Sequence, residues 1–287
     1  MKNIISKLAV ILFLCICLIS DSYAQNSEDK LCLWKIQNAG NKVYLLGSLH
    51  LMPENIYPLN KRINDAFFES DFLVVEADIN KNQENLQKLI AENAIFSEND
   101  QNLKTLLPED LYDQLSHELK KCGVDIQKFH NFKPWFVGLT YGSLKLSMID
   151  VKVGQGIDMH FINSAEQNNK EILELESIGA QIEMFSSMTL EEQTENLRFQ
   201  IEDTNTIKAY FEMLEAWKKG DTETLNNISR IKMKKRSKDL KSLTKYYAKL
   251  FTERDSAMFK KIDSYLTGDD KKTYFIIVGV FHLVGED

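Results

Sequence analysis

Two short segments near opposite ends of the 287-residue chain share one pattern, an apolar run followed by Gly-x-x-His-Leu. The first is "YLLGSLHL", which ends in His50 and Leu51, and the second is "FIIVGVFHL", which ends in His282 and Leu283. The chain contains only five histidines, so this repetition singles out two of them. An apolar, β-branched run that stops at glycine places each histidine just past the end of a predicted strand.

Two imidazoles in the same position suit a divalent metal ion such as Mn, Co or Zn, and a carboxylate often completes such a ligand set. Glu76 follows the apolar run "FLVV", where an acid costs free energy unless it is exposed or has a task. We therefore interpret His50, His282 and Glu76 as candidates for one shared site. The alternative is that both histidines are hydrogen-bonded structural residues, because a single Gly-x-x-His is a weak motif.

The other histidines and motifs give weaker evidence for a functional site. His117 lies in a charged segment, His130 lies in a predicted loop, and His160 could line a cleft beside Asp158 in "GIDMHF". The sequence contains no His-Glu-x-x-His, Cys-x-x-Cys, P-loop or Gly-x-Ser-x-Gly pattern, so the common signatures of zinc proteases, nucleotide-binding proteins and serine hydrolases are missing.

The elements that must position these residues alternate between strand and helix near the N-terminus. We expect strands over residues 31–37 and 42–49 around a tight turn, a helix over 59–70 and a strand over 71–79. The last strand is predicted over 273–280. The pattern indicates an α/β fold, with a central mixed sheet built from both ends of the chain and a large helical insertion. Such a sheet could bring both imidazoles to one edge, because functional groups gather at strand ends.

The insertion, from about residue 84 to 270, is predicted to be mostly helical. Pro108 and Pro134 each suit the start of a helix, and residues 156–170 form another amphipathic segment. Residues 189–221 predict one or two helices that begin with a capping box of Thr189 and Glu192. Residues 171–177 are a short strand candidate. The basic segment 230–245 is interpreted as a solvated helix face, with a phosphate- or membrane-binding patch as the alternative.

The first 24 residues have the layout of a secretory signal peptide. Two lysines precede a run of twelve apolar residues, and small residues at Ser22 and Ala24 mark a cleavage point. We expect residues 25–287 to form a single exported domain, periplasmic or secreted, with no transmembrane segment. An uncleaved membrane anchor is the alternative.

The net charge and the cysteine content limit which partners and which cellular compartment are expected. The net charge of −7 makes nucleic acid a poor partner. After removal of the leader, Cys32 and Cys122 remain. An oxidising compartment permits a disulfide between them, and two unpaired thiols are the alternative. The sequence does not predict an oligomeric state.

The chain resembles the TraB/GumN family, which is related to the Tiki proteins. The similarity rests on eight segments spread over the mature chain: "LCLWKI", "YLLGSLHLMP", "FLVVEADI", "KPWF", "GQGIDMHF", "ILELES", "LFTERDSAM" and "FIIVGVFHLVG". It implies an erythromycin-esterase/Tiki-like fold and a metal-dependent protease or hydrolase. The implied site contains His50, His282 and Glu76 as metal ligands or catalytic groups, together with Arg254.

Under this interpretation the substrate is a peptide or a small amide or ester. Glu76 is a ligand or the base that takes a proton from metal-bound water, and Arg254 stabilises an oxyanion or a substrate carboxylate. Two alternatives are a non-catalytic protein that sequesters peptides and a haem- or metal-binding protein. The chain ends five residues after His282, where the family continues, so we expect a domain truncated at its C-terminus.

Overall fold

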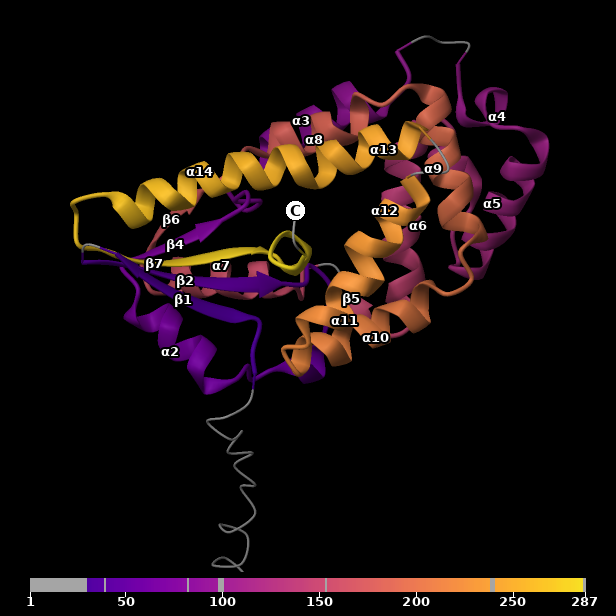
Figure 1. The fold of residues 1–287 in the computed structure, drawn as a ribbon. Helices are drawn as coiled ribbons and strands as arrows, with labels where there is room; N and C mark the ends of the chain where they lie inside the picture. Colours follow the sequence, from indigo (N-terminus) through magenta and orange to yellow (C-terminus); the bar gives the residue numbers. More distant parts are fainter. Residues whose placement is uncertain are drawn as a thin grey trace, which may run out of the picture.

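The computed structural model describes residues 30–38, 40–81, 83–97, 101–152, 154–237 and 241–285. The predicted signal peptide lies outside these residues. The centre of the fold is a five-stranded mixed sheet with the strand order β1-β2-β7-β4-β6 (Figure 1). Its strands are β1 (Leu33–Asn38), β2 (Asn41–Ser48), β4 (Phe72–Val75), β6 (Glu171–Glu174) and β7 (Thr273–Gly279). The chain is therefore an α/β protein, as predicted.

Sheet pairing makes the two Gly-x-x-His segments direct neighbours. β1 pairs with β2 in the antiparallel sense, and the other four strands run parallel to one another. Leu46 on β2 is the partner of Ile277 on β7, and Ser48 is the partner of Gly279. β7 lies in the middle of the sheet, and its central residues are all buried, as expected of a parallel strand covered on both faces.

Helices cover both faces of this sheet. On one face, α2 (Lys61–Glu69) and α7 (Ile157–Gln167) bring the rings of Phe67 and Phe161 against Phe275 of β7. On the other face, α14 (Arg254–Thr267) runs along the sheet and packs Met258 against it (Figure 1). Burial on both sides fixes the register, because a shift by one residue would exchange the two faces.

The remaining helices form a second layer beyond the C-terminal ends of the strands (Figure 1). They are α3 (Gln83–Ala94), α4 (Leu103–Leu106), α5 (Glu109–Lys121), α6 (Pro134–Ser147), α8 (Ile178–Ser186), α9 (Leu190–Glu202), α10 (Thr206–Lys218), α11 (Thr222–Asn226), α12 (Lys232–Ser237) and α13 (Lys241–Tyr247). The short segments of the described residues include β3 (Met52–Pro53), β5 (Val151–Lys152), η1 (Glu54–Ile56) and η2 (Ile126–Phe129). Leucines of α4, α5 and α9 pack with Val137 and Tyr141 of α6 into a separate apolar core.

Several local predictions can be compared with these elements. Residues 189–221 contain two helices, α9 and α10, and α9 begins with the predicted capping box of Thr189 and Glu192. The strand candidate at 171–177 is β6, so the sheet also takes a strand from the middle of the chain. Within the described residues, no helix is long and apolar enough to cross a membrane. Both Cys32 and Cys122 are free thiols.

One prediction about the basic segment is wrong at its first residue. Arg230, in the π-helical segment η3 (Asn227–Ile231), is only 4% exposed. Its Nη1 lies 3.0 Å from Asp255 Oδ2 and donates to the carbonyl oxygen of Phe281 at 3.3 Å. Arg230 therefore supports the segment around the second Gly-x-x-His instead of facing solvent.

Candidate functional site

The loops after the four parallel strands carry the candidate residues to one edge of the sheet. His50 lies two residues beyond β2, and Glu76 follows β4 directly. His282 ends the short helix η5 (Val280–His282) that continues β7, and Glu176 lies two residues beyond β6. Parallel strands end at the same edge, so the sheet topology itself gathers these side chains.

Gly279 marks the point where three of the side chains converge. A Cβ atom added to Gly279 would lie 3.3 Å from Glu76 Oε1, 3.5 Å from His282 Cδ2 and 3.7 Å from His50 Nε2. Because all three atoms lie within 3.7 Å of one point, they are close neighbours of one another. The Gly279 N–H donates to Glu76 Oε1 at 2.6 Å, so the absent side chain leaves room for the carboxylate to reach the backbone.

Arg254 connects three acceptors in this region. It is the first residue of α14 and follows the π-helical segment η4 (Ala248–Glu253), a helix irregularity that is frequent at functional sites. Its guanidinium donates to Glu76 Oε2 at 2.6 Å and to Glu176 Oε2 at 3.0 Å, and its Nη1 lies 3.0 Å from His282 Nε2. We call His50, Glu76, His282 and Arg254 the strand-end site.

Each histidine of the strand-end site has a carboxylate at its Nδ1 atom. His50 Nδ1 lies 2.9 Å from Asp158 Oδ2, and Ser48 Oγ donates to Asp158 Oδ1 at 2.8 Å. His282 Nδ1 lies 2.5 Å from Asp255 Oδ1. An Nδ1–H that donates to a carboxylate leaves Nε2 as the acceptor, which is the arrangement usual for metal-ligating and catalytic histidines.

The two histidines differ in exposure. The side chain of His50 is 66% exposed, whereas that of His282 is 8% exposed. The ring of Phe251 lies against His282, with 5.6 Å between the ring centroids. His50 is therefore open to a substrate or to water, and His282 is held inside the protein by Asp255, Arg254 and Phe251.

The charges around Glu76 keep its carboxylate ionised. Burial by itself would raise the pKa of Glu76, but His50, His282, Arg254 and the Gly279 N–H outweigh it and hold the pKa below its usual value. Both carboxylate oxygens accept hydrogen bonds, and Gln181 Nε2 contributes one more at 3.3 Å. A negative charge on Glu76 is thus available at neutral pH for a cation or a proton.

The pKa of His50 is shifted in the opposite direction. Asp158 raises the pKa of His50, the loss of some solvent around the ring opposes this effect, and Glu76 adds to it. Burial likewise raises the pKa of Asp158, but His50 and Ser48 outweigh it, so the pKa of that carboxyl is lowered. Because the His50 side chain is largely exposed, solvent screens its attraction to Asp158 and limits what the pair adds to stability.

Two glycines allow the close packing that fixes the histidines. A Cβ atom on Gly156 would lie 2.2 Å from the carbonyl oxygen of His50, and a Cβ atom on Gly47 would lie 2.7 Å from Val280 Cγ2. Gly156 precedes α7, which also carries Asp158. The "GQGID" segment therefore supports His50 through its backbone and through a side chain.

The structure also assigns neighbours that the sequence did not reveal. His160 stacks on Tyr57, with 4.6 Å between ring centroids, whereas Asp158 is the residue that contacts His50. Asp158, Asp255 and Glu176 were not predicted to belong to the site. Their only sequence signal was their position inside the segments "GQGIDMHF", "LFTERDSAM" and "ILELES".

The residues at the site can be tested for their fit to a divalent ion. Among the described residues, no group of three His, Cys, Asp or Glu side chains is arranged to hold one. The donor chemistry does fit, since His50 Nε2 and Glu76 Oε1 lie beside the same point and both histidines are oriented through Nδ1. His50 and Glu76 would hold the ion, and His282 would join them on releasing Arg254.

A family model matches residues 32–287, which is most of the chain. This chain belongs to the TraB/PrgY/gumN family. The match covers every strand of the sheet and all four residues of the strand-end site. The resemblance drawn from the sequence segments is thereby confirmed at the level of the family.

Curated relatives match half of this chain or somewhat more. A protein called YbaP from Escherichia coli K12 is 25% identical over 146 residues, which are 50% of this chain and 52% of YbaP. A Treponema pallidum protein is 25% identical over 175 residues, which are 60% of this chain and 51% of that protein. The chain thus spans about half the length of the curated relatives it matches. No solved structure matches it significantly.

Proposed function

We propose that the strand-end site hydrolyses an amide bond in a peptide or a related small amide or ester. The observation that supports this most is the convergence of His50 Nε2, Glu76 Oε1 and His282 at Gly279. Buried, charge-coupled groups at the ends of parallel strands are typical of catalytic sites. We further propose that the fold is erythromycin-esterase/Tiki-like, which superposition of an experimental structure would test.

The roles follow from the contacts of each side chain. Glu76 holds a cation or accepts a proton from the attacking water, and Arg254 stabilises the oxyanion that forms on the substrate carbonyl. When no ion is bound, His50 donates a proton to the leaving nitrogen, because it is exposed and its pKa is raised. A divalent ion bound by His50, Glu76 and His282 would supply a water of lowered pKa.

The test is turnover of a peptide library by the purified chain with added Mn, Co or Zn, with and without a chelator. Glu76→Gln should abolish cleavage and retain the fold. Glu171→Gln is the matched control, because Glu171 is exposed at the start of β6 and outside the site. Absence of cleavage under every metal condition, or equal cleavage by Glu76→Gln, would overturn the proposal.

A non-catalytic site that sequesters peptides is the second candidate. It is favoured by the hydrogen bonds of Glu76 and His282, because both side chains already contact Arg254. In that case the chain binds peptide stoichiometrically, and neither metal nor Glu76→Gln changes the amount of intact peptide. Mass spectrometry of a peptide incubated with excess protein separates the two candidates.

We also propose export of the chain after cleavage behind Ala24. The support is the order of lysines, apolar run and small residues in the first 24 positions. N-terminal sequencing of the expressed protein tests the proposal. Mature material that begins at Met1 would contradict it.

A further inference from the structure

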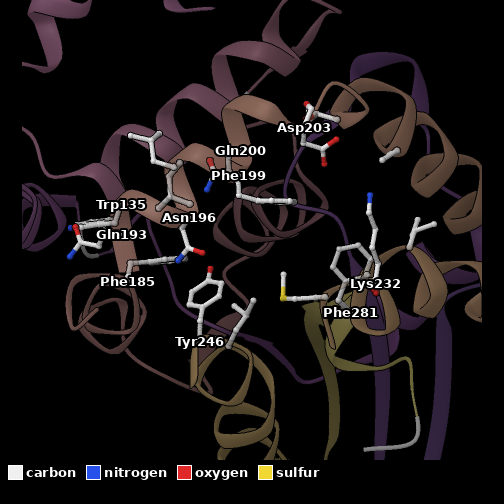
Figure 2. Close-up of a pocket in the computed structure, with 18 of the residues that line it drawn as sticks. Trp135, Phe185, Gln193, Asn196, Phe199, Gln200, Asp203, Lys232, Tyr246 and Phe281 are labelled. Carbon is white, nitrogen blue, oxygen red and sulfur yellow. The ribbon is translucent and has the colours of Figure 1, made fainter. Parts of the chain in front are cut away.

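A cavity of about 460 Å³ lies between the helical layer and the end of β7. Its walls are mainly aromatic and aliphatic, and Figure 2 shows Trp135, Phe185 and Gln193 toward one end and Phe281 toward the other. The volume falls within the range of small-molecule and peptide side-chain pockets, which are mostly apolar with a few placed polar groups. Phe251 is the one lining residue that also contacts the strand-end site among the described contacts named above.

The cavity adjoins the strand-end site without containing it. His50, Glu76 and His282 do not line it, but Phe281 precedes His282 in the chain, and the lining residue Phe251 packs on the His282 ring at 5.6 Å. A molecule that fills the cavity therefore lies against the residues that hold His282 in place. This position suits a part of a substrate next to the reacting bond.

The cavity wall contains a buried polar atom that has no hydrogen-bond partner among the described residues. Gln193 is 1% exposed, and its Oε1 atom is unbonded although its Nε2 donates to the carbonyl oxygen of Met188 at 2.8 Å. The Tyr246 hydroxyl, whose pKa is raised to about 12 mainly by burial, belongs to the same cavity wall. A buried acceptor without a donor is costly, and a soft terminal amide torsion allows Oε1 to turn toward a ligand.

These groups decide between chemical classes of ligand. The unbonded Gln193 Oε1 needs a donor, and a fatty acyl chain carries none. A peptide supplies N–H donors for Gln193, carbonyl acceptors for Tyr246, and apolar side chains for the aromatic walls. Figure 2 shows the Tyr246 hydroxyl directed toward the Asn196 side chain, at the same end as Gln193.

We propose that this cavity is a specificity pocket that binds large apolar side chains of a peptide beside the strand-end site, with Gln193 accepting a hydrogen bond from a peptide N–H and Tyr246 donating to a peptide carbonyl. The inference rests on the proposed function only for the cleavage step. Peptide binding can be measured apart from cleavage, because the cavity residues differ from the residues of the strand-end site.

The experiment measures binding by calorimetry in a Glu76→Gln background. The probes are acetyl-Leu-Phe-Leu-amide, the polar acetyl-Asp-Ser-Asp-amide and decanoate. Ala209→Trp places a large ring inside the cavity, since Ala209 lines it, and should weaken binding of the apolar peptide at least tenfold. The control is Ala91→Trp, at an exposed position on α3 outside the cavity, which should leave the affinity unchanged.

A second pair of variants tests the role of Gln193. Gln193→Met keeps the length of the side chain but removes the acceptor, and should weaken binding of the apolar peptide three- to tenfold. Gln167→Met, at an exposed position at the end of α7, should have no effect. Equal affinity in Ala209→Trp, tighter binding of decanoate than of the peptide, or no binding of the apolar peptide would each overturn the inference.

The outcomes also separate this inference from the proposed hydrolysis. Suppose that the wild-type chain binds the apolar peptide, that Ala209→Trp does not bind it, and that no peptide is cleaved. The pocket inference is then supported and the hydrolase proposal fails. If the chain cleaves polar and apolar peptides equally well and Ala209→Trp does not alter the rates, hydrolysis stands and the pocket inference fails.

Discussion

Arg254 and Glu76 are joined by a hydrogen-bonded ion pair of 2.6 Å, although 178 residues separate them in the chain. The pair ties the first turn of α14 to the end of β4. The Arg254 side chain is 14% exposed and that of Glu76 is 6% exposed, so solvent screens this pair little. The pair thereby holds the start of α14 against the sheet at the strand-end site.

Removal of the arginine charge should therefore destabilise the protein strongly. Arg254→Gln removes the guanidinium that pairs with both Glu76 and Glu176, and we expect a loss of about 3–5 kcal/mol in the free energy of unfolding. Urea denaturation measures the change. Arg198→Gln is the control, since its pair with Asp110 is exposed and should be worth at most about 1 kcal/mol. Equal losses in the two variants would contradict this account.

The glycine that touches the His50 backbone should not tolerate a methyl group. Gly156→Ala places Cβ 2.2 Å from the His50 carbonyl oxygen, so the loop must shift, and overpacking of this kind costs about 1–3 kcal/mol. In Gly142→Ala, on α6, the new Cβ has no atom within 4 Å. That variant should gain about 0.5–1 kcal/mol, because alanine favours a helix. Thermal melts that rank the two variants in the reverse order would refute the prediction.

The titration of His50 should depend on Asp158. We expect the pKa of His50, followed by NMR in the presence of a chelator, to be raised from 6.5 to about 9. Asp158→Asn removes the main cause and should lower this pKa toward its usual value. The exposed His117 on α5 serves as the internal reference, because its signal should not respond to the substitution.

The sign of the accompanying stability change follows from the raised pKa. The His50–Asp158 attraction is fully present below pH 6.5 and is lost as the pH rises through about 9. The change should be small, because the His50 side chain is 66% exposed and solvent screens the pair. A stability that instead falls as the pH drops from 9 to 6.5, and does so only when Asp158 is present, would show that the assignment is wrong.

The two histidines should differ in their effect on folding. His50→Ala removes an exposed ring and should change the free energy of unfolding by about 0.5 kcal/mol or less. His282→Ala removes a buried ring together with its contacts to Asp255 and Arg254, so we expect a loss of about 1–3 kcal/mol. Chemical denaturation of both variants measures the difference, and equal losses would contradict the burial argument.

The strands and the candidate residues at their ends could be predicted from local patterns. Apolar runs that stop at Gly47, Gly279 and Glu76 mark strand ends without any knowledge of packing, because burial on both faces of a parallel strand demands a continuous apolar run. The helix starts at Pro108 and Pro134 depend on the same local chemistry.

The partners of those residues were decided by tertiary structure alone. Asp158 reaches His50 across 108 positions of the chain, and Arg254 reaches Glu76 across 178. No local pattern encodes such distances, since they depend on how α7 and α14 pack on opposite faces of the sheet. The basic segment that begins at Arg230 shows the same limit: its composition indicates a solvated face, but packing against the end of β7 buries its first arginine. Sequence determined which residues stand at the strand ends, and packing determined which charges surround them, because the first depends on neighbouring residues and the second on contacts between distant elements.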